Sequence, residues 1–334
     1  MSEFSNTKFS GENYANGRPN YPPQLYDKLK AIYLENKNAT AIKDPILIDL
    51  GCGPGTATFQ LKAADFLNNP NGKYIGIDPS LKMIEAAEKQ LSISKEANVE
   101  FKIGNELDFG KDFVDNSNVA VITAVQCCHW FDFPAFLANA YKILSKSKGN
   151  LFLYGYINTR ILEYPELDGI IDDLDKGFET GFGAYWDQPG RKYLSDLLTD
   201  DFFMKSLEQS DFKNVSVSRY INKSDRNPLV LLDNDEITDK PHYFLHKRAT
   251  IKHFREYVTT WSAYNRCKRE KGDEFADKLI DDFFNKIFKT IPGLSYDSEV
   301  NLVWNTYVIS ANCYCNKSRF CLPKKIKKKK KYIF

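Results

Sequence analysis

The feature that most restricts the fold of this chain is a regular alternation of apolar runs and helix-like segments between residues 45 and 156. The runs are short enough to be buried strands, and the segments between them follow the helical period. This alternation predicts an α/β fold with a mostly parallel sheet and helices on both faces. We expect strands at 45–50, 73–78, 99–104, 118–125 and 150–156, and helices at 56–67, 79–91 and 133–145.

The pattern changes in the second half of the chain. Residues 157–210 are richer in Asp, Gly and aromatic residues, which predicts helices and loops, and residues 222–248 are polar and typical of a loop. Two further strands and two amphipathic helices are expected, the strands at 212–221 and 299–310 and the helices at 249–270 and 274–291. This order predicts a seven-stranded sheet with a helical cap inserted at 222–298.

A glycine-rich turn joins the first strand to the first helix, in the run Asp49-Leu-Gly51-Cys-Gly53-Pro-Gly55-Thr56. Glycines let the backbone approach a ligand, and the N–H groups at a helix N-terminus suit a polar or anionic group. The third glycine follows the second too closely for the dinucleotide pattern G-x-G-x-x-G. Taken alone, the turn could equally be a tight strand–helix connection that binds nothing.

Polar residues follow the next two strands at the same edge of the predicted sheet. Asp78 ends the second strand, where a carboxylate can accept hydrogen bonds from both hydroxyls of a ribose. Asn105 and Glu106 follow the third strand, where an adenine ring could lie. Open α/β sheets bind ligands at the carboxyl ends of their strands, so the combination predicts a nucleoside site.

Together these motifs resemble those of the class I S-adenosylmethionine-dependent methyltransferases, over about residues 40–156. The resemblance implies a Rossmann-like fold with S-adenosyl-L-methionine as the cofactor. It implies that the glycine turn holds the methionine part, Asp78 the ribose, and Asn105 or Glu106 the adenine. The residues assigned to the cofactor are Tyr14, Arg18, Asp49, Gly51, Gly53, Gly55, Thr56, Asp78, Asn105, Glu106 and Ala124.

Further motifs narrow the resemblance and extend it to about residues 8–308. They are Phe9-Ser-Gly-Glu-Asn-Tyr14, Arg18-Pro-Asn-Tyr21-Pro, Gln126-Cys-Cys-His129-Trp-Phe-Asp, Tyr185-Trp-Asp-Gln-Pro-Gly-Arg191, Thr260-Trp-Ser-Ala-Tyr and Val303-Trp-Asn-Thr. This set is similar to the fungal trans-aconitate methyltransferases and their drug-resistance relatives, which methylate a carboxylate of small polycarboxylic acids. The resemblance implies a methyl ester as product and a role in small-molecule detoxification.

A carboxylate acceptor needs no strong general base, because a reference pKa of about 4 leaves it ionised near neutral pH. Such an enzyme has to align the reactants, exclude water and place charge. Arginine is the best planar partner for a carboxylate. We therefore expect Arg191, Arg18 and His129 to act as local cations in catalysis and substrate binding, with Arg160 as a further candidate. The alternatives are surface positions for the arginines and a core position for His129 against Trp130.

Several other interpretations stay open at this point. Trp186, Trp261 and Trp304 could wall the pocket or belong to the core. Cys127 and Cys128 would point to opposite faces of a strand, so no metal site is predicted. The acceptor could be another small molecule, such as a lipid or a drug-like acid or anhydride. The chain could also be a binding protein that keeps this fold and sequesters a small molecule.

Charge is distributed unevenly along the chain. Lys and Arg number 46 against 44 Asp and Glu, but residues 316–334 hold nine of the basic residues and no acidic ones. We expect one methyltransferase domain at 1–311, with an N-terminal lid at 1–40 and a cofactor-binding core at 41–156, followed by a basic, disordered tail at 312–334. The tail could touch anionic surfaces, although nothing firm indicates nucleic acid. Without a long apolar run or a secretory signal, we expect a cytoplasmic enzyme for a small anionic substrate, of unknown oligomeric state.

Overall fold

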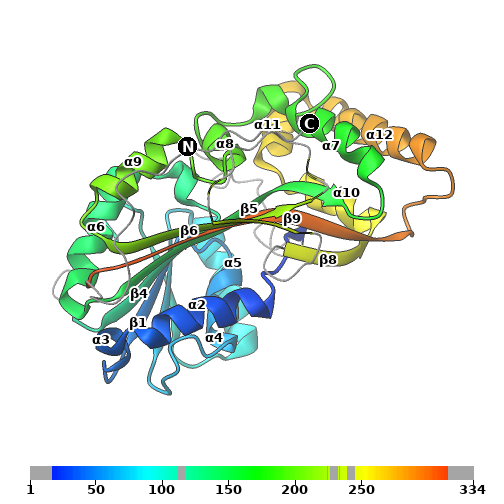
Figure 1. Ribbon diagram of the computed structural model, residues 1–334. Helices are drawn as coiled ribbons and strands as arrows, with labels where there is room; N and C mark the ends of the chain where they lie inside the picture. Colours follow the sequence, from blue (N-terminus) through cyan, green and yellow to red (C-terminus); the bar gives the residue numbers. More distant parts are fainter. Residues whose placement is uncertain are drawn as a thin grey trace.

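The computed structural model describes residues 17–111, 117–223, 225, 232, 234–238 and 245–314. Tyr14 and nearly all of the predicted basic tail lie outside the described residues. The described part is a central sheet covered by helices on both sides (Figure 1). None of its helices is both long and apolar enough to cross a membrane.

The first half of the chain forms the alternating strands and helices that the sequence predicts. The strands pair in parallel in the order β3-β2-β1-β4-β5, with bounds β1 (Ile46–Leu50), β2 (Lys73–Asp78), β3 (Val99–Ile103), β4 (Val119–Val125) and β5 (Asn150–Ile161). Between them run α4 (Thr56–Ala63), α5 (Leu81–Ser94) and α6 (Phe133–Ser147). Both β1 and β4 are buried along their whole length, as strands covered on two faces should be.

The two faces of the sheet belong to two separate hydrophobic clusters. Along β4, Val121 and Val125 join one cluster, whereas Ile122 and Ala124 join the other. Successive side chains of a strand point to opposite faces, so an uninterrupted apolar run can serve both clusters at once. The first cluster also receives α2 (Pro23–Glu35), which is followed by the short α3 (Lys37–Thr40).

The prediction of seven strands is wrong, because the described residues form a sheet of nine. The strands β6 (Lys213–Asn222) and β9 (Glu299–Asn312) lie where expected, and β9 runs antiparallel between β5 and β6. Two more strands, β7 (Asp235–Thr238) and β8 (Leu245–Thr250), fall in the segment that was predicted to be a polar loop. Both sequences are polar, as expected of edge strands, and among the described residues each pairs with a single neighbouring strand.

The cap after β8 is helical, but its first predicted helix is broken in two. It consists of α10 (Ile251–Thr259), α11 (Ser262–Lys271) and α12 (Asp273–Thr290). At the break, the Thr260 hydroxyl donates to the carbonyl of Tyr257 at 2.6 Å, and Trp261 takes an extended backbone conformation. The break turns Trp261 toward the interior, where it lines the pocket described below.

Residues 157–210 form the end of β5 and a series of short helices. These are η3 (Pro165–Leu167), α7 (Asp168–Lys176), η4 (Gly183–Tyr185), α8 (Gly190–Ser195) and α9 (Asp201–Gln209). In Figure 1, α7 lies beside α12 at one end of the molecule, whereas α9 lies beside α6. This segment therefore contributes both to the cap and to one face of the sheet.

Candidate active site

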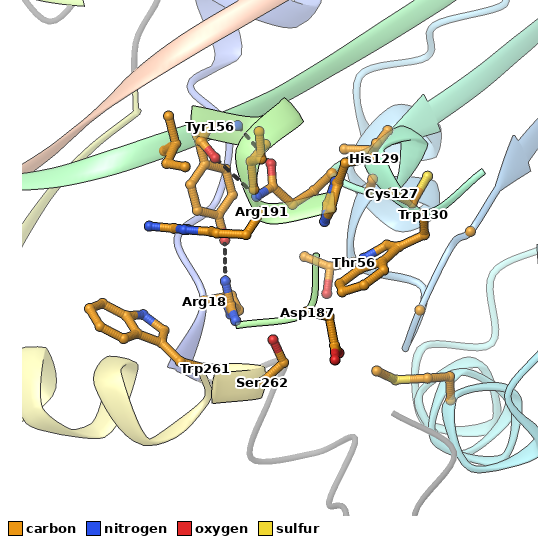
Figure 2. Close-up of a pocket in the computed structure, with 18 of the residues that line it drawn as sticks. Arg18, Thr56, Cys127, His129, Trp130, Tyr156, Asp187, Arg191, Trp261 and Ser262 are labelled. Carbon is orange, nitrogen blue, oxygen red and sulfur yellow. Dashed lines mark hydrogen bonds between the residues drawn. The ribbon is translucent and has the colours of Figure 1, made fainter. Parts of the chain in front are cut away.

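A cavity of about 570 Å³ lies between the carboxyl ends of the parallel strands and the cap. Its volume is within the range of small-molecule and cofactor pockets. Figure 2 shows how distant segments meet there: Arg18 precedes α2, Thr56 begins α4, Tyr156 lies in β5, Arg191 in α8 and Ser262 in α11. The short helix η2 (Cys128–Trp130) contributes His129 and Trp130.

Most of the residues predicted to bind the cofactor line this cavity. The lining includes Arg18, Gly51, Gly53, Thr56, Asp78, Asn105 and Glu106. Three predicted residues do not line it, namely Asp49, Gly55 and Ala124. Their places in the fold show that they support the cavity wall from behind.

The glycine turn contains two positions with different requirements. Gly53 and Gly55 both have positive φ, +56° and +85°. A Cβ on Gly53 would meet no protein atom within 4 Å, and Gly53 lines the cavity. A Cβ on Gly55 would come within 2.7 Å of the Phe101 ring. Gly53 therefore leaves space for a ligand, whereas Gly55 leaves space for the packing of the turn against β3.

Asp49 supports the glycine turn from the core. Its buried carboxylate accepts hydrogen bonds from Thr58 Oγ1 at 2.6 Å and from Thr123 Oγ1 at 2.8 Å. Burial raises the pKa of Asp49 to about 6, although both threonine hydroxyls favour the ionised form. Asp49 thereby joins β1, α4 and β4 behind the turn, and it is not placed to contact a ligand in the cavity.

Asp78 ends β2 with its carboxylate held in a fixed orientation. Oδ2 accepts from the Gly53 amide at 3.0 Å, and Oδ1 accepts from the Ser80 amide at 2.8 Å. Burial raises the pKa of the Asp78 carboxyl, and these two amide bonds counteract part of the shift. Each oxygen retains lone-pair capacity, so the group can also accept hydrogen bonds from a diol in the cavity.

His129 is buried at the cavity wall, with its ring 4.8 Å from the ring of Trp130, measured between centroids. Its Nδ1 has no hydrogen-bond partner among the described residues. Burial, together with the nearby charges of Arg191 and Arg18, lowers the pKa of His129 to about 3. The ring is therefore neutral near pH 7, and the prediction that His129 is a local cation is wrong.

Arg18 and Arg191 each present a guanidinium group to the cavity, as Figure 2 shows. Arg18 donates to the Tyr156 hydroxyl at 3.3 Å and to the carbonyl of Thr260 at 3.0 Å. Arg191 lies over the Trp186 ring, 4.1 Å from its centroid, and forms an ion pair with Asp175. Both groups are thus oriented by protein contacts, which reduces the entropy lost when they bind an anion.

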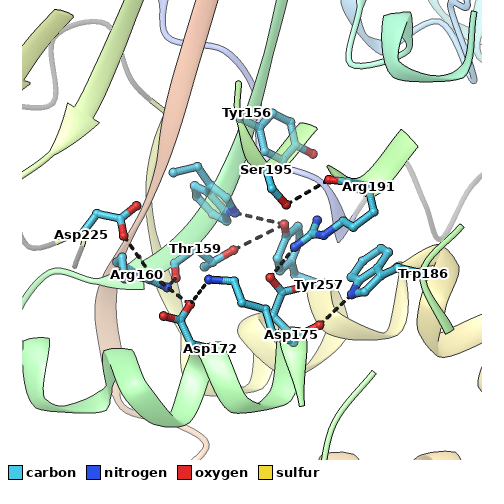
Figure 3. A network of polar contacts seen from close by, with 12 residues as sticks. Tyr156, Thr159, Arg160, Asp172, Asp175, Trp186, Arg191, Ser195, Asp225 and Tyr257 are labelled. Carbon is cyan, nitrogen blue, oxygen red and sulfur yellow. Dashed lines mark hydrogen bonds and ion pairs between the residues drawn. The ribbon is translucent and has the colours of Figure 1, made fainter. Parts of the chain in front are cut away.

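Arg160 is buried among carboxylates and does not resemble a substrate clamp. Its guanidinium lies 3.0 Å from both Asp172 and Asp225 and 3.7 Å from Asp168 (Figure 3). The Arg160 residue is only 1% exposed. A substrate carboxylate would have to displace these partners, so the cluster is better explained as a link between β5, α7 and residue 225.

The tryptophans divide between pocket and core. Trp186 and Trp261 line the cavity with ring centroids 5.6 Å apart, whereas Trp304 is buried in β9 and donates to the Tyr257 hydroxyl at 3.1 Å. Gln126 and Asp175 also line the cavity, and neither was predicted to be a site residue. Gln126 directly follows β4, a position that marks the active edge of such sheets. For Asp175 no local signal exists, because its place depends on how α7 packs.

Comparison with known proteins agrees with this geometry. Residues 43–170 match a family model described as "Methyltransferase domain". Residues 43–170 thus form a methyltransferase domain. A Saccharomyces cerevisiae protein described as a probable S-adenosylmethionine-dependent methyltransferase is 25% identical over 314 residues, which cover 91% of this chain and 96% of that protein. A candidate methyltransferase from Dictyostelium discoideum is 29% identical over 64% of this chain and 71% of its own length.

A solved structure has the same fold. The candidate type II methyltransferase from Anaeromyxobacter dehalogenans superimposes with a TM-score of 0.58 at 20% identity, over 89% of this chain and 98% of that one. This likeness confirms the predicted Rossmann-like methyltransferase fold. The Saccharomyces cerevisiae relative is described as dependent on S-adenosylmethionine. The open space at Gly53 and the oriented carboxylate of Asp78 fit such a nucleoside-containing group.

Proposed function

We propose that this methyltransferase forms a methyl ester on a carboxylate of a small polycarboxylic acid such as trans-aconitate. The observation that carries the proposal is the pair of guanidinium groups, Arg18 and Arg191, beside the neutral ring of His129 in one cavity. Guanidinium groups bind carboxylates in a planar, bidentate geometry. A neutral histidine can form a directional hydrogen bond to the acid, but it does not attract an anion by charge as a protonated histidine would.

The residues around the cofactor have separate roles in this proposal. Bound S-adenosylmethionine supplies an activated methyl group on a sulfonium. The backbone around Gly53 and the N-terminal turn of α4, which begins at Thr56, would hold its polar parts, and Asp78 would accept hydrogen bonds from the ribose hydroxyls. Trp186 and Trp261 would exclude water from the reacting atoms.

The two arginines are expected to orient the part of the acid that does not react. A carboxylate paired with a guanidinium is a weaker nucleophile, and its ester would leave that guanidinium without its charged partner. The reacting carboxylate therefore belongs beside neutral His129, while Arg18 and Arg191 orient the rest of the acid. Because the carboxylate is already ionised, the protein contributes alignment rather than proton transfer.

The test is a methyl-transfer assay with labelled cofactor and a panel of tricarboxylic, dicarboxylic and monocarboxylic acids and lipid precursors. Ester formation restricted to polycarboxylic acids is expected. In Arg191→Gln we expect KM for the acid to rise about tenfold or more, because a charged hydrogen bond is lost, with little change in cofactor affinity. Arg255→Gln, in α10 and outside the cavity lining, is the matched control.

Three results would redirect the proposal. If no acid is esterified although the cofactor binds, the proposed acceptor class is wrong. If the protein binds an acid tightly without turnover, it sequesters a small molecule with the same fold. Turnover of a lipid precursor alone would assign the cavity to another acceptor.

A further inference from the structure

A buried carboxylate lies next to the arginine that the proposed function uses. Asp175, in α7, is 6% exposed and lines the cavity together with Arg191. Its Oδ2 forms an ion pair with Nη2 of Arg191, and its backbone carbonyl accepts a hydrogen bond from Trp186 Nε1 at 2.7 Å (Figure 3). Its second oxygen, Oδ1, has no hydrogen-bond partner among the described residues.

This arrangement limits the positive charge that Arg191 can offer to a substrate. One of its terminal nitrogens already faces Asp175, so a second carboxylate has only the remaining N–H groups available. An anion that approaches Arg191 also approaches Asp175, and the repulsion is poorly screened in a site that excludes water. Asp175 therefore orients the guanidinium and at the same time opposes additional negative charge.

Other cations near Asp175 already have carboxylate partners. Arg160 is surrounded by its own cluster, and Lys176 lies 3.0 Å from Asp172. Across the cavity, Arg266 lies 2.8 Å from Asp187. Arg18 also lines the cavity, but it donates to the Tyr156 hydroxyl and to the carbonyl of Thr260, so Arg191 is the cation that Asp175 contacts.

We propose that Asp175 is a specificity-determining residue that favours dicarboxylic over tricarboxylic acceptors. One carboxylate of the acid reacts beside His129, one is held by the open N–H groups of Arg191, and a third is repelled by Asp175. The inference rests on the proposed function and narrows it. Within the class of polycarboxylic acids, a tricarboxylate such as trans-aconitate is then a poorer acceptor than a dicarboxylate of similar length.

Glutarate and tricarballylate provide a matched pair, because the second is the first with one added carboxylate. We expect the wild-type enzyme to favour glutarate at low ionic strength by about tenfold or more in kcat/KM, in line with the cost of like charges in a desolvated site. Asp175→Asn keeps the side-chain shape and removes the charge. It should lower the preference by about tenfold, and raising the salt concentration should lower the wild-type preference in the same direction.

Asp173→Asn is the matched control on the same helix. Its carboxylate bonds Thr180 and Lys286 and does not line the cavity, so this variant should keep the wild-type preference. The affinities of both acids, measured calorimetrically with S-adenosylhomocysteine bound, should show the same order. This second measurement applies even to an acid that is not turned over.

A wild-type preference for tricarballylate, in turnover or in binding, would overturn the role of Asp175. An unchanged ratio in folded Asp175→Asn would do so as well, while ester formation itself would still support the proposed function. If Asp175→Asn does not fold, the wild-type ratio and its salt dependence decide the question. Failure of both acids to bind would refute the inference.

Discussion

The glycine turn allows a sharp separation of ligand binding from stability. Gly53 and Gly55 both have positive φ, so alanine at either position costs about 1–2 kcal/mol of folding free energy through the left-handed backbone conformation. At Gly53 this is the whole cost, because its Cβ would meet no protein atom within 4 Å. At Gly55 the Cβ would lie 2.7 Å from Phe101 and 2.9 Å from Phe59, which adds about 1–3 kcal/mol for overpacking.

The two variants should therefore fail in different ways. Gly55→Ala should lose about 2–5 kcal/mol in the free energy of unfolding, measured by urea denaturation without ligand. Gly53→Ala should lose only about 1–2 kcal/mol, yet its affinity for S-adenosylhomocysteine should fall by about tenfold or more, because the methyl group occupies ligand space. Calorimetric titration of each folded variant measures that affinity.

Gly169→Ala serves as a control for the chemical change itself. Gly169 is exposed in α7, has no positive φ, and an added Cβ would meet nothing within 4 Å. This variant should gain about 0.5–1 kcal/mol in stability from helix propensity, with unchanged affinity. Equal losses of stability in Gly53→Ala and Gly55→Ala, or normal cofactor affinity in Gly53→Ala, would refute the assignment of Gly53 to ligand binding and Gly55 to packing.

Two further predictions concern protonation. The pKa of Asp49 is about 6 in the folded protein against a reference of 3.8, so the folded protein binds this proton more tightly than the unfolded chain does. The contribution of the proton to the free energy of unfolding is complete below pH 4 and is lost as the pH rises through 6. As the pH rises from 4 to 8, the free energy of unfolding of Asp49→Asn, measured by urea denaturation, should increase by up to about 3 kcal/mol relative to that of wild type. A difference that stays constant with pH would mean that Asp49 titrates normally. His129, with a pKa of about 3, should leave kcat/KM flat between pH 5 and pH 8; an inflection near pH 6.5 that disappears in His129→Asn would contradict its neutral state.

The parallel strands could be predicted because their apolar composition reflects burial on both faces of the sheet. Strands buried on both faces, such as β4, are continuous apolar runs bounded by turn residues, and the glycine turn marks the edge where a ligand binds. The strands β7 and β8 carry no such signal, since their residues are polar and each pairs with one strand within the part of the chain that the structure describes. The break between α10 and α11 was also missed, because the apolar period continues across Thr260 and Trp261.

The residues of the candidate site also differ in whether the sequence alone could place them. Residues fixed by local sequence, such as Gly53 and Asp78, could be placed at the cavity from the order of strands and turns. The charge of His129 could not be predicted, because it depends on burial and on two arginines from distant segments. Asp175 could not be predicted for a related reason, because only the packing of α7 against the cavity brings it to Arg191.

The long strand β9 has a consequence for the way the cap can move. Its first residues pair with β8 and the end of β5, and its later residues continue between β5 and β6 in the middle of the sheet (Figure 1). The chain thus returns from the cap through the turns at 291–298 into a strand with hydrogen-bonded neighbours on both sides. The helix α10 packs against β8 and β9, so it cannot swing away from the sheet without disturbing that ladder. The cap and the sheet should consequently melt in a single transition, with the roof of the cavity as rigid as its floor.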